Sequence, residues 1–171
     1  MPNIGSTLDK TVNPADEPAI GSGPVLARLE TFVGKWTTEG QAYDSPFGPA
    51  GRNTAIETYE WLAGGMFLIH RLEGRLGDQP MACIEMTCAD AAHQRYAVQS
   101  FYSDGKTNEW RGQMRDATWT LTGNWVSQRK TTTVRCTAVF GDAGTTIQAK
   151  WEYSTDRLTW MRFWETTATK A

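Results

Sequence analysis

A chain of 171 residues is long enough to bury a hydrophobic core in a single domain without disulfide staples. Lys and Arg total 17 against 19 Asp and Glu, so the formal net charge is only -2. This near balance leaves no broad basic surface for a phosphate backbone, and we expect no nucleic-acid partner. Trp occurs 8 times, and such side chains both fill cores and line apolar pockets.

Cysteine usage and the first residues indicate a compartment. Cys83, Cys88 and Cys136 have no metal-type or redox spacing, and their number is odd. Residues 1–23 contain neither a basic region nor an apolar run of the kind found in secretory signals. No stretch approaches the ~20 apolar residues of a membrane helix. We therefore expect a cytoplasmic protein with no membrane span, whose cysteines act as small core hydrophobes.

The first elements are a leader and a helix. Residues 1–23 mix Pro, Gly, Asn, Asp and Ser, which predicts a flexible leader before a barrel domain over 24–171. Pro24 suits the first turn of a helix, and Gly34 suits its end. Between them apolar residues recur at helical spacing, which predicts one short amphipathic helix over 24–33; they are Leu26, Leu29, Phe32 and Val33.

From Gly34 onward the apolar residues alternate with a period of two, which is typical of strands. About ten strand-like segments are separated by turn residues. They cover roughly 35–42, 52–61, 66–73, 81–88, 95–103, 106–114, 118–123, 131–140, 145–154 and 160–169. Because no helical pattern separates them, we predict an all-β, closed, antiparallel up-and-down barrel with the helix covering one end. A barrel of this size can enclose one small ligand.

The turns also predict which residues lie opposite one another. Asp104-Gly105 is interpreted as a two-residue hairpin turn, which places Gln99 opposite Trp110 and turns Phe101 to the same face.

Two further hairpins give a consistent picture. The next hairpin sets Met114 opposite Trp119, and the one around 141–144 sets Ala138 opposite Ile147. In both pairs of strands one face is then apolar and the other charged, as a half-buried sheet requires.

Gly34-Lys35-Trp36 resembles the Gly-x-Trp signature of lipocalins and related calycins. The resemblance implies a barrel with an internal cavity and with Trp36 packed inside its closed end. Many lipocalins place an arginine of the final strand across that tryptophan, and Arg162 resembles it. The Gly64-Gly65 hairpin and the ending 160–170 are more similar to a bacterial group of lipocalin-like domains of unknown function, over roughly 25–170.

Nitrobindins, which are haem-holding barrels of ten strands, are a related alternative. Their first strand reads Gly-x-Trp-x-Gly-x-Gly, whereas this chain has Thr38 in place of the middle glycine. Their iron ligand is a late histidine, and no histidine follows His93 here. The resemblance would therefore leave only His70, from a different wall, as a ligand. We expect no cofactor, and two histidines without suitable cysteines predict no metal site.

The hairpin around 62–65 carries the candidate catalytic pair. The register predicted from its glycines sets Glu57 opposite His70, on the same face as Tyr59 and Trp61, and that bulky face is interpreted as inward. A carboxylate beside an imidazole can act as a general acid–base pair. The same pair can equally be a cross-strand contact at the rim that supports the sheet.

The function that the sequence favours is the binding of one small apolar or amphipathic molecule in the barrel. The expected lining is Trp36, Tyr59, Trp61, Leu68, Ile84, Met86, Gln99, Phe101, Trp110, Trp119 and Trp151, with the Gln99 amide orienting the ligand. Two alternatives stay open: an enzyme that uses Glu57 and His70 on a cyclic or carbonyl metabolite, and a haem-binding barrel. The sequence is also compatible with a homodimer, and with a packed core whose surface is what functions.

Overall fold

The computed structural model describes residues 23–90, 93–127 and 130–171, so the predicted leader lies almost wholly outside the described residues. Within them the chain forms a short helical segment followed by ten strands. The strands are β1 (Gly34–Ala42), β2 (Gly51–Trp61), β3 (Phe67–Leu76), β4 (Gln79–Asp90), β5 (Arg95–Tyr102), β6 (Thr107–Arg115), β7 (Thr118–Ser127), β8 (Lys130–Gly141), β9 (Thr146–Ser154) and β10 (Met161–Lys170).

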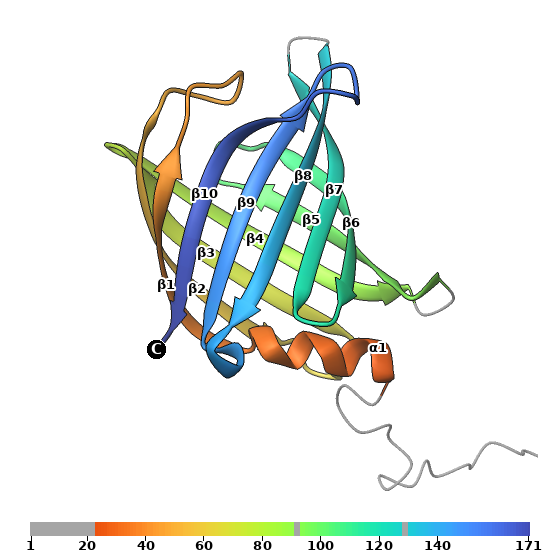
Figure 1. The fold of residues 1–171 in the computed structure, drawn as a ribbon. Coiled ribbons are helices and arrows are strands. Elements are labelled where there is room, and N and C mark those ends of the chain that lie inside the picture. The colour runs from red at the N-terminus through yellow and green to blue at the C-terminus, as the bar shows by residue number, and fades with distance from the viewer. Residues whose placement is uncertain (1–22, 91–92, 128–129) are drawn as a thin grey trace, which may run out of the picture.

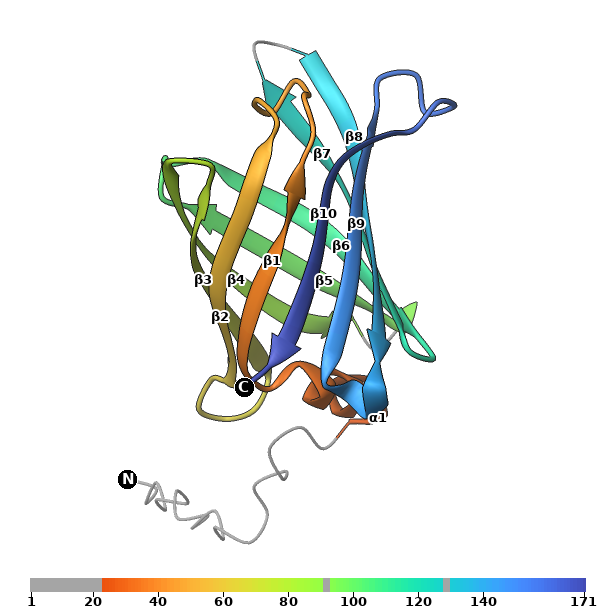
Figure 2. The ribbon, with the colours of Figure 1, turned by 60° about the vertical axis from the view of Figure 1, so that its left-hand side comes forward.

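Each strand pairs with its neighbours in sequence, and β1 pairs with β10 to close the ring. All pairings are antiparallel, and Figure 2 shows the first and last strands side by side. The predicted up-and-down barrel is thus confirmed. Closure removes the two free sheet edges that would otherwise invite aggregation.

The helical segment lies across one end of the barrel (Figure 1). It consists of α1 (Pro24–Ala27) and the 3-10 helix η2 (Arg28–Phe32). Its buried residues are Leu26, Leu29 and Phe32, and this spacing of three suits a 3-10 helix, in which side chains three apart are eclipsed. A second 3-10 turn, η4 (Asp142–Gly144), connects β8 and β9. No helix in the described part of the chain is long and apolar enough to cross a membrane.

Aromatic packing closes the helical end. Trp36 is fully buried, and its Nε1–H donates to the Phe32 carbonyl over 2.7 Å. The Phe32 ring lies 4.8 Å from that of Phe140 and 5.6 Å from that of Trp119. Tyr96 donates its hydroxyl to the helix, at the Val25 carbonyl, over 2.6 Å. These contacts close this end of the barrel and form the floor of its interior, as expected from Gly34-Lys35-Trp36.

The cation over Trp36 is Lys170, not Arg162. The Lys170 Nζ lies 5.1 Å from the centre of the indole ring, whereas Arg162 lies over Tyr43 and pairs with Glu165 at 2.6 Å. The reason is strand direction, because β10 runs antiparallel to β1 and pairs Lys170 with Trp36. Arg162 therefore lies near the opposite end of the barrel, and that prediction was wrong.

Two hairpins differ from the predicted registers by two residues. Tyr59 pairs with His70 rather than Leu68, and Ala138 pairs with Ala149 rather than Ile147. Because the side-chain period of a strand is two, such a shift keeps each residue on its predicted face. The predicted pairing of Met114 with Trp119 is confirmed.

The register of the β5–β6 hairpin differs from the predicted one by a single residue, which changes the faces of its side chains. Its turn is longer than two residues, because the Tyr102 amide donates to the Lys106 carbonyl, and Gln99 consequently pairs with Glu109. This shift of one residue turns Gln99 and Phe101 to the outer face.

The outer face of this region has an apolar character. Phe101 is 44% exposed and lies opposite Ile84, which is 45% exposed, while Met86 pairs with Gln99 on the same face. The homodimer that the sequence allowed stays a prediction.

Two glycines make room for tryptophan rings inside the barrel. An added Cβ at Gly112 would lie 2.4 Å from Cη2 of Trp119, and one at Gly123 would lie 2.6 Å from Cε3 of Trp110. In each case the indole ring occupies the space that a larger residue would need. The two rings are therefore fixed by the absence of a side chain on a neighbouring strand.

We expect Gly112→Ala to destabilise the protein by about 1–3 kcal/mol, since the ring of Trp119 must move in a close-packed interior. The matched control is Gly51→Ala, another strand glycine, at which an added Cβ would meet nothing closer than 3.6 Å. Urea unfolding of both variants measures the difference. Equal stability of the two variants would contradict this account of the packing.

Candidate functional site

The barrel encloses a cavity of about 440 Å³, which extends from the helical floor to the opposite end. Most of its lining is apolar. The β1–β2 loop reaches over its mouth, where the Phe47 ring lies 4.6 Å from Phe163 and 5.6 Å from both Trp125 and Tyr153. A cavity of this size, mostly apolar with a few polar groups, is typical of sites for small molecules.

The predicted lining residues divide into three groups. Five of them line the cavity, namely Tyr59, Leu68, Trp110, Trp119 and Trp151. Trp36 and Trp61 lie at the closed end instead, Trp36 within the floor and Trp61 donating its Nε1–H to Glu30 over 2.8 Å. Met86, Gln99 and Phe101, and with them Ile84, are on the outer face, so their expected inward orientation was wrong.

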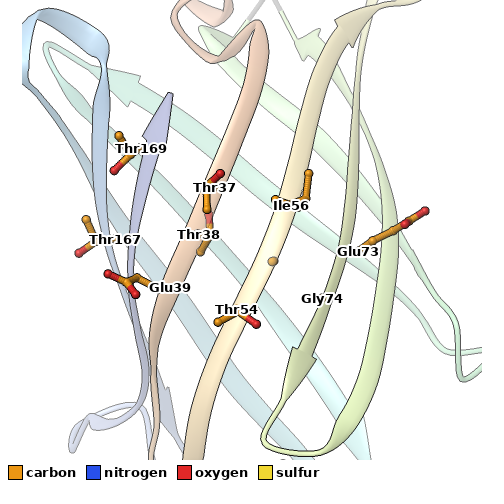
Figure 3. A pocket seen from close by; sticks show the side chains of 10 residues that line it. Thr37, Thr38, Glu39, Thr54, Ile56, Glu73, Gly74, Thr167 and Thr169 are labelled. Carbon is orange, nitrogen blue, oxygen red and sulfur yellow. The ribbon is translucent and has the colours of Figure 1, made fainter. Parts of the chain in front are cut away.

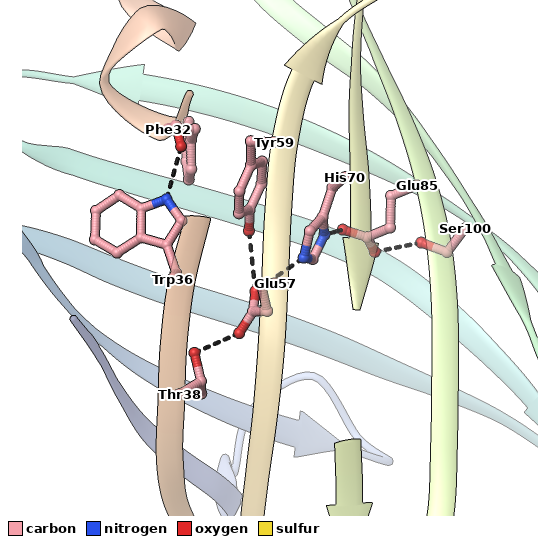
Figure 4. A network of polar contacts seen from close by, with 8 residues as sticks. All are labelled: Phe32, Trp36, Thr38, Glu57, Tyr59, His70, Glu85 and Ser100. Atoms are coloured by element: carbon pink, nitrogen blue, oxygen red, sulfur yellow. Dashed lines mark hydrogen bonds and ion pairs between the residues drawn. The ribbon is translucent and has the colours of Figure 1, made fainter. Parts of the chain in front are cut away.

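A polar cluster crosses one wall of the cavity, and the predicted pair is part of it (Figure 4). The Nε2 atom of His70 lies 2.8 Å from an oxygen of Glu57, and its Nδ1 atom lies 2.8 Å from an oxygen of Glu85. Glu57 and His70 are diagonal rather than directly opposite, because Tyr59 is the residue that pairs with His70. The imidazole is thus held between two carboxylates that come from β2 and β4.

Neighbouring side chains satisfy the remaining carboxylate oxygens. Thr38 donates to the free oxygen of Glu57, and Tyr59 donates more weakly to the other oxygen over 3.3 Å. Ser100 donates to Glu85 over 2.6 Å and accepts from the Nε1–H of Trp110 over 2.8 Å. A buried polar network is stable only when its members are paired in this way.

The Tyr59 ring supports His70 from one side. The two rings are parallel within 1° and their centroids are 4.1 Å apart. A charged imidazole gains from such contact with an aromatic face.

Charge in the cluster is set by these contacts. Burial alone would lower the pKa of His70, but donation to Glu57 and Glu85 outweighs it and raises that pKa from 6.5 to about 9. Burial would raise the pKa of Glu57 and of Glu85, yet bonds from His70 and from the hydroxyl groups bring both below the ordinary 4.5. At neutral pH the cluster therefore holds one positive and two negative charges.

The sequence pattern gave no indication of Glu85. On β4 the apolar residues Ile84 and Met86 were expected inside, whereas the structure turns Glu85 inward with Cys83 and Thr87. Only a general rule could have suggested a second partner: a buried imidazole needs partners for both ring nitrogens, and Glu57 supplies only one.

Thr38 takes part in the polar cluster. Its position is the one at which the haem-barrel pattern carries glycine, and its hydroxyl group binds Glu57 while the residue is only 3% exposed.

Neither the acid–base interpretation nor the haem interpretation fits this arrangement of His70. Because its pKa is raised to about 9, His70 is protonated on both ring nitrogens at neutral pH and donates to two carboxylates, so the imidazole offers no lone pair to a substrate or to iron. The other histidine, His93, is exposed and bonded to Asp90 over 2.9 Å. Among the described residues no group of three or more His, Cys, Asp or Glu side chains is arranged to hold a metal ion.

Two residues that line the cavity each have a buried polar atom without a hydrogen-bond partner in the described part of the chain. The atoms are Oδ1 of Asn53 on β2 and Nε1 of Trp164 on β10. Asn53 is 2% exposed, and Gly40 makes space for its amide, because a Cβ there would lie 2.8 Å from Oδ1. Burying such atoms costs free energy unless something pairs with them. The cavity wall thus contains one buried acceptor and one buried donor that are unpaired.

A second hollow, of about 340 Å³, lies on the outside of the barrel over β10, β1, β2 and β3 (Figure 3). Its exposed polar side chains are those of Glu39, Glu73, Thr37, Thr54, Thr167 and Thr169. Its buried polar lining residue, Thr38, has its hydroxyl bonded to Glu57 of the inner cluster. The inner cavity is therefore the candidate site.

Comparison with solved structures gives the same fold. Rv2717c from M. tuberculosis superposes with a TM-score of 0.66 at 11% identity, covering 87% of this chain and 98% of that one. The S-type phycobiliprotein lyase CPES from Guillardia theta gives 0.55 at 13% identity, with 92% and 98% covered. No curated protein matches the sequence significantly. The profile of DUF1579, described as a protein of unknown function, matches residues 23–161, and the chain belongs to that family.

Proposed function

We propose that this protein binds one small, amphipathic molecule inside its barrel. The observation that carries the proposal is the cavity of about 440 Å³ inside the barrel, whose walls are mainly apolar and contain an unpaired acceptor on Asn53 and an unpaired donor on Trp164. An apolar body would replace water against the aromatic walls, and a polar group would pair with either atom once its side chain turns toward the cavity. The two similar structures support the barrel shape alone, at 11% and 13% identity.

The catalytic alternative has weaker support. A general base needs a free lone pair near the substrate, and His70 has both nitrogens engaged. We therefore propose binding without turnover. The cluster would act as a polar part of the binding wall and as a fixed element of the fold.

We expect the protein to bind a neutral fluorescent probe, N-phenyl-1-naphthylamine. The binding should saturate at one molecule per barrel and quench the tryptophan fluorescence. Trp110, Trp119 and Trp151 all line the cavity and would report the probe. The test variant is Ala149→Phe, which fills part of the cavity from β9. Because the added ring occupies the space that the probe needs, we expect at least tenfold weaker binding.

The matched control is Ala97→Phe, the same change on the exposed outer face of β5. It should leave the affinity unchanged, and thermal melting of both variants checks that they fold. If Ala149→Phe binds the probe as well as the control does, the probe is bound elsewhere and the cavity is not the site.

A further inference from the structure

If the cavity binds an amphipathic molecule, as proposed above, the charge of its wall determines which polar group it accepts. Charged side chains are few on the described wall: Glu57, His70 and Glu85 form the central cluster, and Asp104 and Lys106 form an ion pair at the mouth. The pair at the mouth is exposed and balanced. The central cluster has two carboxylates for one imidazolium, so it carries an excess of one negative charge.

This charge lies deep in the barrel. The side chains of Glu57 and His70 are 12% and 10% exposed, and that of Glu85 is 18% exposed. Their donors come from protein side chains, so little water screens the charge from a bound molecule. A second negative charge in the same cavity would face this cluster at short range, whereas a donor or a cation would be attracted to it.

The cluster also lacks a cation with spare donors. The described side chains that line the cavity include no arginine, and both N–H groups of His70 are already bonded. Carboxylate groups are recognised best by such free, forked donors. The hydroxyl donors Thr38, Tyr59 and Ser100 are directed at the two glutamates and are likewise in use.

We propose that the cavity selects amphiphiles with a neutral or positively charged hydrogen-bond donor as their head group, and that it rejects those with a carboxylate. A hydroxyl group or an ammonium group can donate to the wall formed by Glu57 and Glu85. A carboxylate of the same shape is repelled by that wall and finds no free cation within it.

Three ligands with one ten-carbon tail test this selectivity near neutral pH: decanol, decylamine and decanoate. Each competes with N-phenyl-1-naphthylamine on the wild-type protein, below its micelle concentration. We expect decanol and decylamine to displace the probe, and decanoate to bind at least tenfold more weakly than decanol, which corresponds to about 1.4 kcal/mol. Tight binding of decanoate, equal to that of decanol, would overturn the inference.

Charge variants then test whether the cluster is the cause. Glu85→Gln keeps the size of the side chain and removes the excess charge, so decanoate should bind more tightly and decylamine more weakly. The control, Glu73→Gln, removes one negative charge from the outer face of β3 and should change neither affinity. If Glu85→Gln fails to fold, the three ligands on the wild-type protein still decide whether the cavity rejects a carboxylate.

The two proposals fail in different ways. If the probe binds and decanoate binds as well as decanol, only the charge selectivity falls. If neither the probe nor any of the three amphiphiles binds, the proposed function falls and the selectivity falls with it.

Discussion

Replacing His70 with leucine is expected to destabilise the protein by about 3–5 kcal/mol at neutral pH. The change leaves Glu57 and Glu85 buried without the cation that each now contacts at 2.8 Å. It also removes the ring that is stacked on Tyr59 at 4.1 Å. Unpaired buried carboxylates are costly, and they reduce the cost by taking up protons. Urea unfolding at several pH values measures both effects.

The leucine variant should gain stability as the pH falls from about 8 to about 5, because its carboxyl groups then have a folded pKa above the unfolded one. His93→Gln is the control, since His93 is the other histidine and is exposed beside Asp90. That change should cost less than about 0.5 kcal/mol. A loss below about 1 kcal/mol for His70→Leu would show that the cluster is not a paired, buried unit.

Stability of the wild-type protein is expected to fall by about 2 kcal/mol between about pH 6 and pH 8.5. The folded pKa of His70 is raised from 6.5 to about 9, so the protonated form stabilises the fold fully below about pH 6.5 and is lost as the pH rises through 9. The folded pKa values of Glu57 and Glu85 are lowered, so the stability that these groups contribute is present above pH 4.5 and is lost as the pH falls. The free energy of unfolding should therefore be greatest between these limits, near pH 5 to 6.

The upper limit of about pH 8.5 separates this effect from the buried thiols, because an unfolded thiol ionises near 9.0 while burial raises the pKa of Cys83 to about 12. A triple variant, Glu57→Gln, His70→Gln and Glu85→Gln, keeps polar groups of similar size without charge. Its stability should be nearly flat over this interval. The same slope in the triple variant would assign the effect to other groups.

Much of the fold follows from the pattern of the sequence. Alternation and turn residues were enough to predict ten antiparallel strands, because a two-residue error in register leaves faces unchanged. The β2–β3 hairpin illustrates this: Tyr59 pairs with His70 instead of Leu68, yet Glu57 and His70 still meet inside. Their contact could be predicted because both lie on the face that carries the bulky apolar residues.

The site could be predicted only in part. At Asp104-Gly105 a longer turn shifted the register by one residue, which exchanged Gln99 and Phe101 for Val98 and Ser100 on the inner face. On β4 the usual rule of apolar residues inside is inverted around Glu85. Such inversions follow from polar partners on neighbouring strands, and a single-strand pattern contains no information about them.

Closing the ring between β1 and β10 has a consequence for the time course of folding. The β1–β10 pair joins residues far apart in the chain, such as Trp36 and Lys170, whereas every other strand pair is between neighbours in the chain. The neighbouring hairpins can form as each appears, but closure of this long loop carries the largest entropic cost and must come late. Until then the sheet has two free edges and an exposed apolar interior. Chaperone dependence and aggregation should therefore be greatest just before the last strand docks.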